Sequence, residues 1–309
     1  MKRIVFAILL LMIIHVSNAQ PQQVGYPSIR GHYKKLSLLD TSRATGKQKF
    51  DAQFFTVKQG ETIVLNLYSP DLKEELELIG NGRKRVTHYL SSNEMFSIPN
   101  PPANSSAQTR AELDYLIQLQ QQRTEEDKRA SAFFANVYYR TGVVASDQDY
   151  RRMRSNLFHI GRSIGTWFNA DTLPATATLV ANVWKDAEYY MWKHKNFYLR
   201  IRPYKLEPRL QNLEETNWAA YPSGHAMNSY VNAFLFAELL PEFADFFVKD
   251  AYDMAHSREI IGVHYPSDSE SGRLLAFQLI QRLMKNEKFK RDFQSAKKEL
   301  DAAKNTKGF

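Results

Sequence analysis

The stretch AAYPSGHAMNSYVNAFLFAELL occupies residues 219–240 and joins a turn to a long apolar run. Ser223 is a good helix N-cap residue, because its side-chain oxygen can accept a hydrogen bond from a free amide of the first turn. Pro241 follows the run directly, and proline cannot continue a helix. The stretch therefore predicts a helix from Gly224 to Leu240.

Helical patterns also surround this stretch. Residues 107–139 are rich in alanine, leucine, glutamine and glutamate, which are all good helix formers. Further helices are expected at residues 175–198, 243–257 and 269–285, with a polar, lysine-rich helix at the C-terminal end. These segments predict an all-α fold, a multi-helix bundle of antiparallel elements. Steps of three and four predict one more helix with a core-facing stripe made of Tyr150, Met153, Leu157, Ile160, Ile164 and Trp167.

Residues 1–19 have the pattern of a secretory signal peptide. Lys2 and Arg3 precede an apolar run that ends at Ile14, and small residues precede a cleavage site near Ala19. A membrane anchor is the alternative, but the run is much shorter than the roughly 20 residues that span a bilayer. No later segment offers such a run. We therefore expect a bacterial protein that is periplasmic or secreted and has no membrane span.

Composition narrows the chemistry. Cysteine is absent from the 309 residues, which excludes disulfides, thiolate metal ligands and a thiol nucleophile. Without residues 1–19 the chain has 39 basic and 33 acidic side chains, a net charge of +6, which suits a small anionic substrate but is equally common in proteins that bind nothing charged. No basic run is interleaved with aromatic residues, so nucleic acid is not an expected partner.

A change in composition at residues 97–108, SIPNPPANSSAQ, indicates a linker or an extended segment. Residues 20–93 are mixed in character, and FFTVKQGETIVLNLY contains two strand-like runs around Gln59 and Gly60. We expect residues 20–93 to form a small N-terminal extension of unknown role that could contain β-strands. Residues 94–309 are expected to form the helical domain.

The turn before the helix at Gly224 also has the features of an anion site. The unpaired amides and the dipole of a helix start favour a bound anion. Gly224 lets the backbone approach a ligand closely, and Ser223 adds a hydroxyl donor. His225 lies in the first turn, where a protonated imidazole is unfavourable unless an anion lies nearby. A plain helix cap is the alternative interpretation.

Two further stretches carry cations and a histidine. In KNFYLRIRP, Lys195 and Arg202 stand near the end of a predicted helix, where cations are commonly just solvated. In SREIIGVHYPSD, Arg258 has a planar fork that matches phosphate oxygens, and His264 precedes Asp268 by four residues. Taken alone, a histidine and an aspartate at this spacing more often form a surface pair. Because cations accompany the histidines, the set favours an oxyanion over a metal ion, and no essential metal is expected.

Taken in order, the three stretches follow the pattern K-x6-R-P, P-S-G-H and S-R-x5-H-x3-D. This pattern resembles the signature of the type 2 phosphatidic acid phosphatase superfamily, and the surrounding sequence is most similar to its soluble bacterial class A acid phosphatases. The resemblance covers about residues 92–285. It implies an all-helical fold of the acid phosphatase and vanadium haloperoxidase type. It also implies a phosphoric monoester hydrolase that needs no metal and forms a phosphohistidine intermediate.

The resemblance implies a role for each matching residue. His264 would be the nucleophile, Asp268 would fix its tautomer, and His225 would protonate the leaving oxygen. These roles suit phosphoryl transfer, in which charge spreads over three equatorial oxygens and is stabilised by preorganised donors. The phosphate-binding residues would be Lys195, Arg202, Ser223, Gly224 and Arg258.

Two alternatives remain open. A vanadium-dependent haloperoxidase would hold vanadate in the same cradle with His264 as its ligand, whereas a phosphatase would need no cofactor and would be inhibited by vanadate. A non-catalytic phosphate-binding module would need the cradle but not His225, His264 and Asp268. The expected partner is a small phosphorylated substrate. The sequence does not reveal the natural phosphoester, the balance between hydrolysis and phosphotransfer, or the oligomeric state, a homo-oligomer included.

Overall fold

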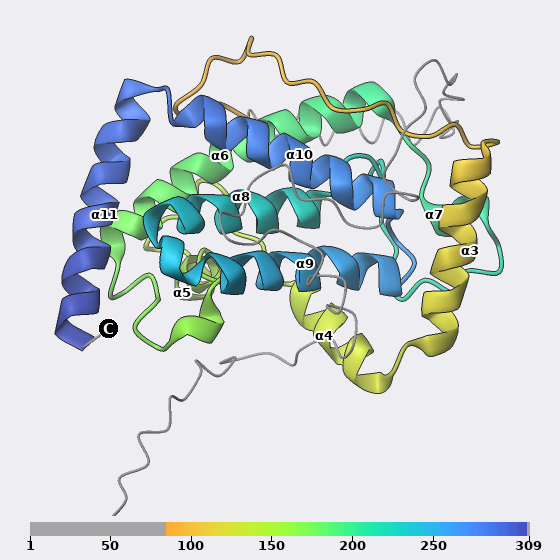
Figure 1. The fold of residues 1–309 in the computed structure, drawn as a ribbon, viewed down its shortest axis with the longest axis horizontal. Helices are drawn as coiled ribbons and strands as arrows, with labels where there is room; N and C mark the ends of the chain where they lie inside the picture. The colour runs from red at the N-terminus through yellow and green to blue at the C-terminus, as the bar shows by residue number, and fades with distance from the viewer. Residues whose placement is uncertain (1–84, 308–309) are drawn as a thin grey trace, which may run out of the picture.

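The computed structural model describes residues 85–307. The predicted signal peptide and most of the predicted extension at residues 20–93, with its strand-like runs, lie outside the described residues. Within the described part the regular structure is helical and contains no strand, which confirms the all-α prediction (Figure 1). The α-helices are α3 (Ala107–Gln122), α4 (Glu125–Ala135), α5 (Tyr150–Asn156), α6 (Pro174–Tyr198), α7 (Pro203–Leu206), α8 (Gly224–Leu239), α9 (Ala244–Ile260), α10 (Pro266–Leu283) and α11 (Glu287–Lys307).

The predicted helix at residues 107–139 is two helices. α3 ends at Gln122, and Arg123 is extended, with φ of −64° and ψ of 136°. Thr124 then caps α4 by accepting a hydrogen bond from the Asp127 amide, while the Asp127 carboxylate accepts one from the Thr124 amide. This reciprocal capping box starts a new helix where composition alone favours continuing the first one.

The predicted helix along Tyr150 to Trp167 is wrong beyond Asn156, where α5 ends. Gly161 and Gly165 have φ of 92° and 137°, a conformation that interrupts a right-handed helix and suits glycine. The prediction that the stripe residues face the core is right. Apolar spacing indicates which residues are buried, and a compact loop can bury them as well as a helix can. The stripe residues that follow α5 are all buried, namely Leu157, Ile160, Ile164 and Trp167.

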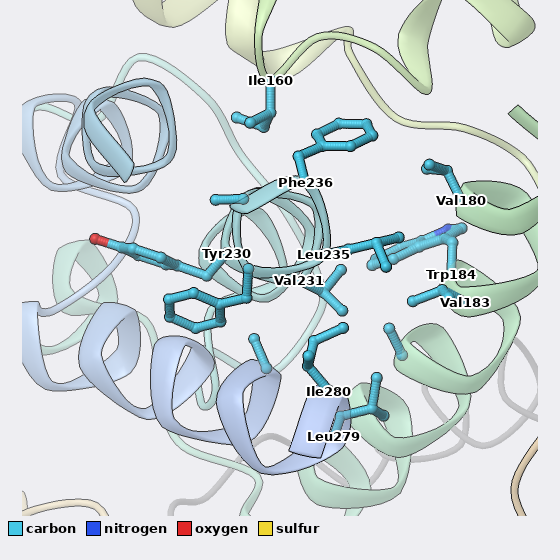
Figure 2. Packing of buried hydrophobic residues seen from close by; sticks show 14 of the residues in the cluster. Ile160, Val180, Val183, Trp184, Tyr230, Val231, Leu235, Phe236, Leu279 and Ile280 are labelled. Atoms are coloured by element: carbon cyan, nitrogen blue, oxygen red, sulfur yellow. The ribbon is translucent and has the colours of Figure 1, made fainter. Parts of the chain in front are cut away.

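α8 is the central helix of the bundle. All of its residues except Glu238 are buried, and it packs most extensively against α9 and α10. Figure 2 shows the side chains of Val231 and Leu235 facing apolar side chains of α6 and α10. Each fully buried aliphatic side chain of this kind stabilises the fold by about 1.5–3 kcal/mol relative to an exposed one. The helix that carries the predicted anion site at its start is thus anchored in the core.

The starts of α8 and α10 are joined. A Cβ atom on Gly272 of α10 would lie 2.8 Å from the carbonyl oxygen of Ser223 and 2.9 Å from Cβ of Ala226, so the crossing requires glycine. The amide of Ser223 donates a hydrogen bond to the carbonyl of Asp268 at 2.9 Å. This close approach brings two of the three predicted motif stretches together.

The segment that leads into the bundle is tied to α6. The amides of His88, Tyr89 and Leu90 donate hydrogen bonds to the carboxylate of Asp186, at 2.9 Å for His88. The ring of Tyr89 packs edge to face on Phe289 of α11. Within residues 85–307, none of the helices combines the length and the apolar character that a bilayer-spanning segment needs.

Candidate active site

The predicted site residues come together at the end of the bundle near α7 (Figure 1). Lys195 lies in the last turn of α6, Arg202 is the N-cap of α7, and His225 is in the first turn of α8. Together with Gly224 and His264 they line a cavity of about 340 Å³. These side chains come from distant parts of the sequence, so the packing of helix ends is what joins them.

His264 lies in the loop between α9 and α10. Its Nδ1 atom is 3.0 Å from Oδ2 of Asp268, and Nη1 of Arg202 is 2.9 Å from its Nε2 atom. Because arginine only donates hydrogen bonds, Nε2 is the acceptor and Nδ1 is the protonated nitrogen. Burial and the charge of Arg202 lower the pKa of His264 to about 3. The ring is therefore neutral at ordinary pH, with a lone pair on Nε2.

Asp268 lies buried in the first turn of α10. Its Oδ2 atom also accepts a hydrogen bond from the Tyr265 amide at 3.0 Å, and its Oδ1 atom accepts one from Nη1 of Arg200 at 2.7 Å. Burial alone would raise the pKa of Asp268, but Arg200 and the hydrogen bond with His264 lower it to about 2. Asp268 therefore stays ionised and holds the tautomer of His264.

A buried layer behind Asp268 contains two charged residues that the sequence patterns did not indicate, Arg200 and Glu112. Arg200 donates from Nη1 to Oγ of Ser267 at 2.7 Å and from Nη2 to Oε2 of Glu112 at 3.0 Å. Glu112, on α3, accepts hydrogen bonds from both the amide and the hydroxyl of Ser267 at 2.9 Å. Arg200 stands two residues before Arg202 in a stretch already singled out, which is a readable signal. Glu112 has none, because it lies on an ordinary helical segment.

Backbone carbonyls orient the two buried cations of the cavity, Lys195 and Arg202. Nζ of Lys195 donates to the carbonyl of Ala219 at 2.6 Å. Arg202 donates to the carbonyls of Trp218 and Val263, each at 2.8 Å. Burial and the charge of Arg202 lower the pKa of Lys195. A carbonyl orients a cation without cancelling its charge, and an anion bound in the cavity would favour the ammonium form of Lys195.

The first turn of α8 presents its backbone to the cavity. Ser223 is the N-cap, and its Oγ atom accepts a hydrogen bond from the Ala226 amide at 3.3 Å. Gly224 leaves no free space for a side chain, because a Cβ atom there would lie 3.0 Å from Sδ of Met191 and 3.0 Å from Oη of Tyr138. The helix start is therefore both capped and closely packed, with Gly224 on the cavity wall.

His225 is buried, and its ring meets the ring of Tyr138 edge to face, with centroids 4.7 Å apart. Its Nε2 atom has no hydrogen-bond partner within the described part of the chain. Burial and the charge of Arg258 lower the pKa of His225 well below its usual value. An anion in the cavity would offset this charge and favour the protonated ring. His225 is thus suited to exchange a proton with a bound ligand.

Arg258 lies outside the cavity lining. Its guanidinium is fully buried and donates to Oε2 of Glu214 at 2.8 Å, to Oγ of Ser257 at 3.0 Å, and to the carbonyl of Ser131. Glu214 does line the cavity, and its side chain is 35% exposed. Five of the predicted residues therefore line the cavity, whereas Ser223, Asp268 and Arg258 support it from behind.

Among residues 85–307, no group of three or more histidine, cysteine, aspartate or glutamate side chains is arranged to hold a metal ion. The cavity instead combines two buried cations with a helix start and a histidine whose Nε2 atom carries a lone pair. Such an arrangement suits the binding of a tetrahedral oxyanion and nucleophilic attack on its central atom.

Comparison with known proteins matches residues 174–291 to the PAP2 superfamily. A non-specific acid phosphatase of Providencia stuartii is 31% identical over 134 residues, which cover 41% of this chain and 54% of the relative. A non-specific acid phosphatase of Salmonella typhi is 28% identical over 149 residues, which cover 46% and 59%. The chain thus spans a little over half the length of these curated relatives.

One solved structure is the first transmembrane PAP2 type phosphatidylglycerolphosphate phosphatase from Bacillus subtilis. It aligns with a TM-score of 0.39 at 17% identity, over 58% of this chain and 85% of that chain. A similarity of this size is too weak to indicate a shared activity.

Proposed function

We propose that the protein is an acid phosphatase that hydrolyses phosphomonoesters through a phosphohistidine at His264, without an essential metal ion. The match of residues 174–291 to the PAP2 superfamily supports the phosphatase activity. The observation that carries the proposal is the state of the His264 ring. Asp268 accepts the hydrogen bond of the Nδ1 proton, so the lone pair lies on Nε2, where it accepts a hydrogen bond from Arg202 until a phosphoryl group binds. The acid phosphatase relatives support the same reaction class.

In the first step the phosphoryl group of the substrate binds among Lys195, Arg202 and the start of α8. Arg202 turns its N–H groups from Nε2 of His264 to the phosphoryl oxygens. Nε2 then attacks phosphorus in line, the bond from phosphorus to the ester oxygen breaks, and His225 donates a proton to the leaving oxygen. The cradle stabilises the charge on the equatorial oxygens, which is the main demand of phosphoryl transfer.

In the second step water attacks the phosphohistidine. His225, left neutral by the first step, accepts the proton of the attacking water. The bond from phosphorus to Nε2 breaks, inorganic phosphate leaves, and Arg202 can again donate to the lone pair of His264. Splitting the hydrolysis in this way replaces one difficult displacement by two easier ones.

Phosphate release from phenyl phosphate, measured with the full chain in the presence of EDTA, tests the proposal. We expect turnover by the unmodified protein, inhibition by vanadate, and no turnover by His264→Ala. His194→Gln is the matched control, because that histidine on α6 contacts the backbone carbonyls of Tyr190 and Phe96 rather than the cavity.

The covalent step has its own test. With labelled phenyl phosphate, an alkaline quench should retain label on the protein and acid should release it, as for a phosphorus–nitrogen bond. Turnover without any trapped label, or full activity of His264→Ala, contradicts the phosphohistidine. Bromide- and peroxide-dependent halogenation with added vanadate, in the absence of phosphate release, would favour a haloperoxidase instead.

We also propose that the protein is exported to the periplasm or the medium after cleavage near Ala19. Residues 1–19 lie outside the described part, and the proposal rests on their sequence pattern. Mass spectrometry of the protein recovered from a bacterial periplasmic fraction should find an N-terminus close to residue 20. An intact Met1 terminus on the recovered protein would contradict it.

A further inference from the structure

Several aromatic rings line the cavity that contains His264. Its volume is about 340 Å³, near the lower end of the range of small-molecule pockets. The phosphoryl-binding residues occupy only part of the lining. The aromatic side chains that line it are Tyr138, Tyr139, Trp184, Trp192 and Trp218.

One group of these rings adjoins His225. The ring of Tyr138 meets the His225 ring edge to face at 4.7 Å, and lies 6.0 Å from the ring of Trp184. In the proposed reaction His225 protonates the leaving oxygen. The group attached to that oxygen therefore emerges beside Tyr138.

A second group adjoins the cation Arg202. The rings of Trp192 and Trp218 pack edge to face with centroids 5.2 Å apart, and both side chains are half-buried. The Trp218 carbonyl accepts a hydrogen bond from Nε of Arg202, and the guanidinium of Arg85 lies 4.5 Å from the ring centroid of Trp192. The ring contact and the Arg85 guanidinium thus pack the Trp192 indole against that of Trp218 at the cavity wall.

The rest of the lining fits a planar apolar group. Met153 and Met191 are part of it, and methionine sulfur makes favourable contacts with aromatic rings. Aromatic rings in turn prefer edge-to-face and offset contacts with other rings. A cavity of about 340 Å³ has room for a phosphoryl group and a single ring system.

We propose, building on the phosphatase function above, that the preferred substrate carries an aromatic ring on its leaving group. The ring would lie between the Tyr138–Trp184 pair and the Trp192–Trp218 pair while the phosphoryl group occupies the cradle. The substrate class is thus an aryl-bearing phosphomonoester, in which the cradle recognises the phosphoryl group and the aromatic wall recognises the leaving group.

Two esters that differ only in the ring test this inference. In 2-phenylethyl phosphate and 2-cyclohexylethyl phosphate the ring is separated from the leaving oxygen by the same two carbons, so the leaving groups have nearly equal reactivity. We expect kcat/KM to be about threefold to tenfold higher for the phenyl ester, as aromatic contacts add to simple burial. Equal kcat/KM values for the two esters would overturn the inference while leaving the phosphatase proposal intact.

Variants then locate the preference. Trp192→Leu and Trp218→Leu should bring the ratio of the two kcat/KM values close to one, largely through KM for the phenyl ester. Trp218→Phe should keep most of the preference, because it keeps a ring. Phe197→Leu is the control, since Phe197 is 72% exposed and lies outside the cavity lining.

The possible outcomes separate the two proposals. If the protein releases phosphate from neither ester nor from phenyl phosphate, the phosphatase proposal itself fails. If both esters react and the leucine variants keep the full preference for the phenyl ester, the preference does not arise at the Trp192–Trp218 wall, and the inference is wrong. Because the wild-type comparison requires no substitution, a variant that fails to fold does not decide the question.

Discussion

Nη1 of Arg200 donates a hydrogen bond to Oδ1 of Asp268 at 2.7 Å, and both side chains are buried. Oδ2 of the same carboxylate lies 3.0 Å from Nδ1 of His264, and the other end of the guanidinium reaches Glu112 at 3.0 Å. The proposed nucleophile, His264, is therefore held in place by one connected set of hydrogen-bonded charged side chains. The segment before α7 and the helices α3 and α10 contribute these supporting groups, and hydrogen-bonded sets of this kind respond strongly to the loss of any member.

Asp268→Asn should lower kcat for phenyl phosphate by about 10³–10⁴-fold, with a much smaller change in KM. An amide cannot act as a charged acceptor for both Arg200 and His264, so the imidazole would lose its defined tautomer. The loss resembles that seen when the aspartate of a serine protease triad becomes asparagine. Steady-state kinetics check this, with circular dichroism to confirm folding. A folded variant with kcat within tenfold of the wild type would contradict the role of Asp268.

Arg200→Met should lower the free energy of unfolding by about 3–5 kcal/mol, because it leaves two buried carboxylates without their cation. The comparison is Arg152→Met, which breaks an ion pair with Asp149 whose side chains are 52% and 51% exposed. An exposed pair of that kind contributes about 0–1 kcal/mol. Urea unfolding of both variants gives the two values, and equal losses would show that the Arg200 network does not stabilise the fold.

Glu112→Gln should change how stability depends on pH. Burial raises the pKa of Glu112 to about 7, although Arg200 partly opposes the shift. Between pH 4.5 and 7 the folded carboxyl keeps a proton that the unfolded chain releases, so this group lowers stability as pH rises through that window. The quantity to compare is the change in the free energy of unfolding between pH 4.5 and pH 7. We expect this change to be more favourable to the folded state in Glu112→Gln than in the wild type, by up to about 3 kcal/mol.

His264 affects the pH dependence of stability in the direction opposite to Glu112. The Glu112→Gln variant must therefore be compared with the wild type, in which the His264 contribution is the same. The lowered pKa of His264, about 3, means that the folded ring is neutral where the unfolded ring is protonated. Its contribution to stability therefore rises with pH between about 3 and 6.5. Urea unfolding of both proteins at several pH values isolates the contribution of Glu112 to the free energy of unfolding. Parallel curves would mean that Glu112 ionises normally.

Glu214→Gln should tighten inhibition by inorganic phosphate about threefold to tenfold, the scale of one partly screened charge at short range. Glu214 lines the cavity and offsets the charge of the buried Arg258 behind the wall, at 2.8 Å, so removing its carboxylate leaves that charge to attract an anion bound in the cavity. The control is Glu188→Gln, which removes a carboxylate from the same cavity but away from Arg258, beside Arg85 and Thr141. Inhibition constants for phosphate check the prediction. Weaker inhibition in Glu214→Gln would show that Glu214 orients Arg258 for binding instead.

Local sequence patterns predicted the elements that carry the site. The helix from Gly224 is present and is capped by Ser223, and the helix predicted at residues 175–198 is present one residue longer at its start. Lys195 and Arg202, which looked like solvated cations when taken alone, both line the cavity. Their order along the chain, rather than any single stretch, indicated that they act together.

The sequence by itself determined the helical class, the helix start at Gly224 and the residues of the three motif stretches, because caps, apolar spacing and motif order are local properties of the chain. Only the tertiary structure decided that Glu112 stands behind Ser267, 155 residues away, and that Arg258 pairs with Glu214 rather than facing the cavity. Those pairings follow from which helix ends meet and from where a buried charge finds a partner. The residue spacing within one segment cannot indicate which side chains of distant segments will pair.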